Sequence, residues 1–188
     1  MRATLALLSL LFVATAARAA DPRIHGFRIE LDGDRVLASL VLTDAFNHRF
    51  RERVDSGLPT AILYRFELDL DRKHWWDREL AGNTLEVVAT YDAVERTYAV
   101  HLRLDGKLIE SRTVRDRAAL EAAMTHVERV PVFTLPEELG RKRLLLKARA
   151  EFGMRTILSV IPATLATDWQ ESPKFRRPYS PPPEAPPP

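Results

Sequence analysis

Aromatic and titratable side chains gather most densely at residues 71–77, which read Asp-Arg-Lys-His-Trp-Trp-Asp. Successive residues of a strand point to opposite faces, so one indole can enter a core while its neighbour faces solvent. An exposed indole beside charged groups can stack on a sugar ring or anchor a peptide. We therefore take His74, Trp75 and Trp76 as candidate ligand- or partner-binding residues. The alternative is that both tryptophans cover the end of the core.

A second aromatic candidate is Trp169, which follows Thr167 and Asp168 near the end of the expected domain. The same stacking chemistry makes it a candidate binding residue. The alternative is a latch, in which the Thr-Asp-Trp segment closes the domain and binds nothing.

The familiar signatures of catalysis are missing from the sequence. The five histidines form no His-Glu-x-x-His pattern, and no serine lies in Gly-x-Ser-x-Gly or Ser-x-x-Lys. No Gly-x-Gly marks a phosphate loop. Acid pairs such as Asp69 and Asp71 become catalytic only when burial separates their pKa values, and we expect these two in solvent. We predict no catalytic residue, no metal and no cofactor, and an enzyme with a dispersed carboxylate site is the alternative.

Cysteine content and charge exclude further classes. The chain has no cysteine, which excludes disulfides, thiolate zinc sites and N-terminal lipidation. Its 28 basic and 26 acidic residues give a net charge of +2. Removing Arg2 and Arg18 with a signal peptide leaves 26 of each, so nothing in the charge favours nucleic acid as a partner.

The first 19 residues have the three parts of a secretory signal. Arg2 opens a positive segment, residues 5–13 are apolar, and Ala17 and Ala19 are small residues before a cleavage site. The uncharged run at residues 3–17 is shorter than the roughly 20 residues that span a bilayer. We expect cleavage after Ala19 and a soluble periplasmic protein that is neither a lipoprotein nor membrane-spanning.

The elements that must position any site are mostly strands. Apolar residues alternate with polar ones at 27–31, 62–70, 85–91, 98–104 and 144–152, as in antiparallel strands with one buried face. Asp-Gly pairs at 32–33 and 105–106 indicate hairpins, the first leading into a strand at 36–42 and the second into one at 107–111.

Two stretches have helical spacing instead. In residues 44–56, Phe46, Phe50 and Val54 recur every four residues, with Thr43 or Asp44 as cap and a stop at Gly57. In residues 116 to about 128, Asp116 caps an apolar stripe. We predict a mainly β fold (α+β possible): an antiparallel β-sandwich or half-open barrel of about eight strands with two short amphipathic helices.

The chain divides into a signal peptide at 1–19, one β-rich domain at 20–172 and a proline-rich tail at 173–188. The tail holds 8 of the 13 prolines. We expect it to be extended, polyproline-like or disordered. It serves either as a spacer or docking peptide, or as a free end without a partner.

The order of several landmarks resembles that of a known family. These landmarks are Leu-Val-Leu-Thr-Asp at 40–44, Asp-Ser-Gly-Leu-Pro at 55–59, Tyr64 followed by Trp-Trp-Asp at 75–77, Tyr-Asp at 91–92, Thr-Tyr at 97–98, the helix at 118–123 and Asp-Trp at 168–169. The chain is similar to an exported bacterial family known only as a domain of unknown function. In some Gram-negative genomes its genes lie beside a nitrogen-regulation-type sensor kinase. The resemblance implies an exported sandwich-like domain and transfers no active residue.

We predict a soluble periplasmic binding or protein-interaction module without catalysis of its own. Its partner is an unknown envelope protein or peptide, and the resemblance adds a sensor kinase as a candidate. Two alternatives stay open: an envelope hydrolase or glycan-processing enzyme, and an accessory sensor domain for a membrane kinase.

Overall fold

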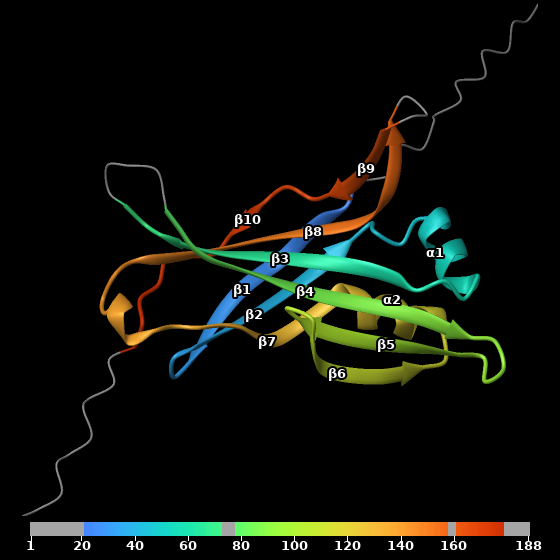
Figure 1. Cartoon of the computed structure of the whole chain (residues 1–188), viewed down its shortest axis with the longest axis horizontal. Coiled ribbons are helices and arrows are strands. Elements are labelled where there is room, and N and C mark those ends of the chain that lie inside the picture. The colour runs from blue at the N-terminus through green and yellow to red at the C-terminus, as the bar shows by residue number, and fades with distance from the viewer. Residues whose placement is uncertain (1–20, 73–77, 158–160, 179–188) are drawn as a thin grey trace, which may run out of the picture.

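The computed structural model describes residues 21–72, 78–157 and 161–178. Two antiparallel sheets pack face to face (Figure 1). The smaller has the order β1-β2-β7, formed by β1 (Arg23–Asp32), β2 (Arg35–Thr43) and β7 (His126–Thr134). The larger has the order β10-β8-β3-β4-β5-β6, with β9 also paired to β8. Its strands are β3 (Thr60–Leu70), β4 (Arg78–Asp92), β5 (Thr97–Leu104), β6 (Lys107–Val114), β8 (Leu144–Ile157), β9 (Ile161–Ala166) and β10 (Gln170–Glu171).

This architecture confirms the predicted mainly β fold. The described part contains ten strands, two α-helices and one 3-10 turn, η1 (Glu137–Leu139), and its sheets do not close into a barrel. The count exceeds the expected eight because β7, β9 and β10 lack a clear two-residue alternation in the sequence.

The core lies between the sheets, on the faces that the alternation predicts. Every second residue of β3 is buried, from Ile62 through Tyr64 and Phe66 to Leu68. Leu40 of β2 and Leu146 of β8 belong to the same apolar cluster. Burial of such side chains contributes about 25 cal/mol per Å² of apolar surface, which is how a chain without disulfides is held together.

Both predicted Asp-Gly hairpins are present. Asp32 pairs with Arg35 around one turn, and Leu104 pairs with Lys107 around the other. In the second turn Asp105 and Gly106 both have positive φ, 47° and 80°, as a two-residue hairpin loop requires.

Helix α1 (His48–Asp55) begins later than predicted. Its cap is Asn47, whose Oδ1 accepts a hydrogen bond from the Phe50 backbone N–H at 3.0 Å, so the expected cap at Thr43 or Asp44 was wrong. Asp44 has a left-handed φ of 61° and lies outside the helix. The stop at Gly57 is confirmed by its φ of 80°. Phe50 and Val54 are buried, as the spacing predicts.

Helix α2 (Arg117–Thr125) begins as predicted and ends early. The Asp116 carboxylate accepts from the Ala119 backbone N–H at 2.8 Å. The expected continuation to about Glu128 was wrong, because β7 starts at His126 and pairs with β2. A register shift between Ala38 and Leu40 interrupts this pairing and obscures the strand period in the sequence.

None of the helices in the described ranges has the length and apolar character needed to cross a membrane.

Candidate functional site

The larger sheet ends at β6, and this edge is the main candidate site. From Tyr98 opposite Val114 to Leu104 opposite Lys107, β6 pairs with β5. In the described part of the chain no strand pairs with its other side. Main-chain N–H and C=O groups along that side are therefore free to bind an extended polypeptide. Figure 1 shows β6 at the rim of the sheet.

A groove of about 340 Å³ lies beneath this edge. Ala119 and Ala122 of α2 form part of its wall, and His126 and Glu128 of β7 line it as well. The alanines are only partly buried and leave room for a second chain to approach. The groove therefore lies between the inner face of β6, α2 and the edge of the smaller sheet.

An ion pair on β6 lies at the border of the apolar core. Glu110 and Arg112 are opposite the buried Leu102 and Val100, so both occupy core-facing positions. Their side chains form an ion pair of 2.7 Å and are 48% and 38% exposed. The Arg112 Nε atom is itself buried and has no hydrogen-bond partner among the described residues.

Apolar side chains are also exposed on β6. Leu108 is 53% exposed and Ile109 is 41% exposed. The register shift between Leu102 and Arg103 makes Ile109 an extra residue in the strand. Residues 110–114 beyond it pair without interruption, so they form the regular part of the free edge.

Across the groove, the edge formed by β7 is less suited to strand addition. Arg129 has a φ of 47° beside a register shift, and Pro131 lacks a main-chain donor. The Asn83 side chain donates a hydrogen bond of 2.5 Å to the Val132 carbonyl, which occupies that acceptor from β4. Of the two edges that border the groove, β6 is thus the better template for a partner strand.

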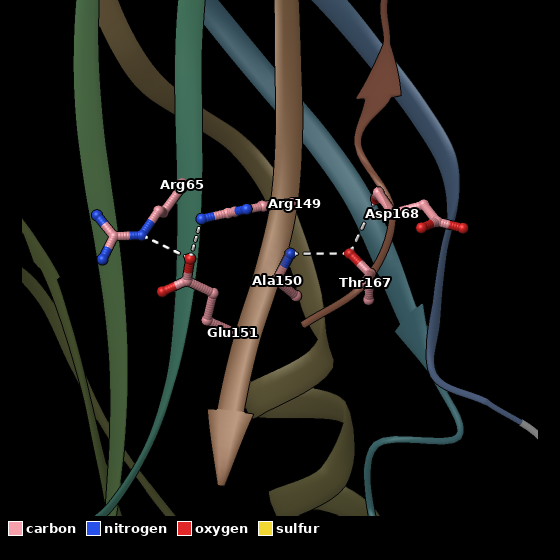
Figure 2. A network of polar contacts seen from close by, with 6 residues as sticks. All are labelled: Arg65, Arg149, Ala150, Glu151, Thr167 and Asp168. Atoms are coloured by element: carbon pink, nitrogen blue, oxygen red, sulfur yellow. Dashed lines mark hydrogen bonds and ion pairs between the residues drawn. The ribbon is translucent and has the colours of Figure 1, made fainter. Parts of the chain in front are cut away.

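The opposite edge of the larger sheet is covered by the C-terminal part of the described chain. Residues 167–175 run along β8: the Ala150 N–H donates to Thr167 Oγ1 at 3.0 Å, and the Leu146 N–H donates to Ser172 Oγ at 3.1 Å (Figure 2 shows the first). Phe175 and Leu144 exchange two backbone hydrogen bonds of 2.9 and 3.0 Å. The pairing therefore continues two residues past Pro173, where the tail was expected to begin.

The predicted binding residues fall into two groups. His74, Trp75 and Trp76 lie outside the described residues. Trp169 is half-buried, and the Arg149 guanidinium lies over its ring, 4.7 Å from the centroid. Arg149 and Arg65 both contact Glu151, at 2.5 and 2.8 Å (Figure 2). This packing suits a latch, and a binding role for Trp169 stays a prediction.

The expectation that Asp69 and Asp71 are solvated was wrong. Asp69 is 3% exposed, and its carboxylate lies 2.6 Å from Lys147 Nζ. The Asp71 side chain is also buried, 3.0 Å from Arg143 Nε and 2.8 Å from Lys174 Nζ. Lys174 belongs to residues 167–175, which cover this edge of the sheet. The two-residue alternation predicted that both acids lie on the outer face, but it could not show that residues far along the chain pack over them.

Nearby, burial raises the pKa of Glu67, and the negative charges of Glu79 and Asp69 act in the same direction. These carboxylates share their surroundings with the cations of Lys147 and Arg149. Within the described ranges, no group of three or more histidine, aspartate or glutamate residues can hold a metal ion.

One buried contact and one at the surface fix α2, which forms one wall of the groove. The Tyr64 hydroxyl donates to the Met124 carbonyl at 2.8 Å, and burial strongly raises the pKa of this tyrosine. At the start of the helix, Asp55 of α1 accepts from the Tyr98 hydroxyl at 2.9 Å and pairs with Arg117 at 2.6 Å. Burial and the bond to Asp55 both raise the pKa of Tyr98.

Comparison with known proteins gives one match. The family described as a domain of unknown function (DUF4390) matches residues 19–169. That range contains β6, α2 and β7, but it ends before Ser172 and Phe175, which help to cover β8. No curated protein and no solved structure matches the chain.

Proposed function

The chain belongs to the family of domains of unknown function DUF4390, and we propose that this domain is an interaction module. It binds an extended segment of another envelope protein, which adds as a strand to the free edge of β6. The observation that carries this proposal is the uncovered edge above a groove of about 340 Å³. The module has no catalysis of its own.

Strand addition uses two kinds of contact. The main chain of the incoming segment bonds to the free groups of residues 110–114, which gives affinity that depends little on sequence. Alternate side chains of the segment then point into the groove, where Ala119 and Ala122 leave room for them. Specificity comes from these side chains and from the charges of Arg112 and Glu128.

Export is part of the proposal and is supported by the signal pattern of residues 1–19. Cell fractionation followed by N-terminal sequencing tests it, with Ala20 expected as the first residue of a periplasmic form. A full-length cytoplasmic product would contradict export. The family resemblance makes a nitrogen-regulation-type sensor kinase one candidate source of the bound segment.

A peptide selection tests binding directly. We would select a displayed library of random nonapeptides against the purified chain without residues 1–19. We expect the enriched peptides to alternate β-branched or aromatic residues with polar ones, as strands do. Selections that yield no shared pattern would contradict strand addition.

Two tryptophan variants locate the site. Ala122→Trp fills the groove and should weaken the selected peptides at least tenfold, whereas Ala118→Trp lies on an exposed part of the same helix and should leave binding unchanged. Thermal unfolding of both variants shows whether the fold is intact. If Ala122→Trp and Ala118→Trp both fold and bind the peptides equally well, the site lies elsewhere.

A further inference from the structure

The free edge of β6 also has a self-complementary sequence. We propose that β6 pairs with β6 of a second copy, giving an antiparallel two-fold dimer centred on Ser111. This inference concerns the same edge as the proposed function, but it requires no other protein. The second copy occupies the edge until a partner segment replaces it.

The order of charges selects this register. With Ser111 on the two-fold axis, Glu110 of each copy lies opposite Arg112 of the other, and Ile109 lies opposite Thr113. Opposite charges at directly facing positions stabilise a strand pair. Both charged residues point to the same face of the sheet, because their β5 partners Leu102 and Val100 are both buried. The two pairs therefore meet on one side of the joined sheet.

The neighbouring registers place like charges together. A shift of the axis by one residue, to Glu110 or to Arg112, sets two glutamates or two arginines directly opposite each other, which is destabilising. An axis between two residues would pair side chains that point to opposite faces. Ser111 is thus the only centre within residues 110–112 that matches both face and charge.

The dimer also supplies what the single chain lacks. The Arg112 side chain is 38% exposed in the single chain, and Glu110 of the second copy brings a second carboxylate to its exposed part. Ile109, exposed in the monomer, gains a neighbour. Because the pairing is only about five residues long, its interface lies at the small end of the range for specific complexes, and the dimer dissociates readily. That property suits an edge that exchanges partners.

A cysteine crosslink tests the register. The chain has no cysteine, so in a single-cysteine variant any disulfide must join two copies. In the proposed dimer the two Cα atoms of residue 111 are about 4.5–5.5 Å apart, within the roughly 4.4–6.8 Å that a disulfide spans. Mild oxidation of Ser111→Cys should therefore give a covalent dimer.

Thr113→Cys is the matched control. Its two Cα atoms are separated by four residues of strand, about 13 Å, and cannot be bridged. It should stay mainly monomeric under the same oxidation. A crosslink in Thr113→Cys as fast as in Ser111→Cys, or none in Ser111→Cys, would overturn the register.

Charge reversal tests the pairing without a crosslink. In sedimentation velocity, Glu110→Arg and Arg112→Glu should each weaken dimerisation about tenfold or more, since two attractive pairs become repulsive. The double variant restores both pairs and should restore the dimer. Glu86→Arg is the control, because Glu86 pairs with Arg103 on the outer face of the same sheet. A double variant as weak as the single ones would refute the proposal.

The outcomes separate the two proposals. A wild-type chain that forms no dimer but still yields peptides with a shared pattern would overturn the self-pairing alone. A specific Ser111→Cys crosslink without any enriched peptide pattern would overturn the proposed function alone.

Discussion

The two edges of the larger sheet are finished in different ways. Along β8, residues 167–175 bond to the strand with backbone groups and with the hydroxyls of Thr167 and Ser172. Along β6, no described segment takes that place. Within the described residues, the chain therefore covers one edge and leaves the other open.

The difference bears on function because an open edge carries a risk. Free main-chain groups on an edge strand invite pairing with other chains, and proteins usually cover or interrupt such edges. On β6 the extra residue Ile109 interrupts one end, but residues 110–114 remain regular. An edge that stays open despite the risk of unwanted pairing is where we expect a binding site.

The ion pairs at the two edges also differ in their exposure to solvent. At the covered edge, the carboxylates of Asp69 and Asp71 are largely removed from solvent and are paired with lysines. At the open edge, Glu110 and Arg112 form an ion pair that solvent reaches. Exposed pairs contribute little to stability, and buried ones are costly to break. The covered edge is thus built for stability, and the open edge keeps its charges available to a partner.

The largest effect should come from uncovering β8. Replacing Thr167 by Val and Ser172 by Ala together removes the acceptors of two buried N–H groups, those of Ala150 and Leu146. Each unpaired buried donor costs about 1–3 kcal/mol, so for the two donors we expect a loss of about 2–6 kcal/mol in the free energy of unfolding. Urea titration followed by circular dichroism measures it.

The open edge supplies the control for that experiment. Ser111 is an exposed hydroxyl that lies 3.0 Å from His101 Nδ1, and Ser111→Ala should change stability by less than about 0.5 kcal/mol. Similar losses at the two edges would show that the covering segment is not the stabilising feature we infer.

The next effect concerns the helix beneath the open edge. Tyr64→Phe leaves the buried Met124 carbonyl without its donor, at a cost of about 1–3 kcal/mol. Since α2 forms a wall of the groove, selected peptides should also bind more weakly. Calorimetry gives both quantities. Wild-type stability in the variant would mean that the hydroxyl does not anchor the helix.

Much of the fold follows from local pattern. Two-residue alternation identified the buried faces of β3, β5 and β8, and Asp-Gly identified two hairpins. Strand β7 was missed because the register shift near Arg129 breaks its alternation and Pro131 argues against a strand. Two-residue alternation therefore predicts a strand only where its pairing has no register shift.

The site was harder to predict, for a physical reason. Glu110 and Arg112 stand at core-facing positions where the other strands have apolar residues, which marks β6 as lying beyond the core. Whether an edge is open depends on where residues far along the chain pack. Thr167 and Ser172 carry no sequence mark of their pairing with β8, and the burial of Asp69 and Asp71 was missed for the same reason.

The smallest effect we predict lies on the outer face near the covered edge, at Glu67. Burial and the charges of Glu79 and Asp69 raise its pKa, so the folded state holds this proton more tightly than the unfolded state does. Its stabilising contribution is thus complete below the ordinary glutamate pKa of about 4.3 and is lost as pH rises through the raised value.

Glu67→Gln removes that titration. Relative to the wild type, the variant should gain a few tenths of a kcal/mol in unfolding free energy between about pH 4 and pH 7, a small change because the carboxylate is partly solvated. Parallel urea titrations at the two pH values measure the difference. A difference that stays constant with pH, or that shrinks as pH rises, would mean that the neighbouring cations Lys147 and Arg149 outweigh burial and the acidic neighbours at this position. The electrostatic environment of Glu67, near the covered edge, would then be dominated by attraction to these two cations.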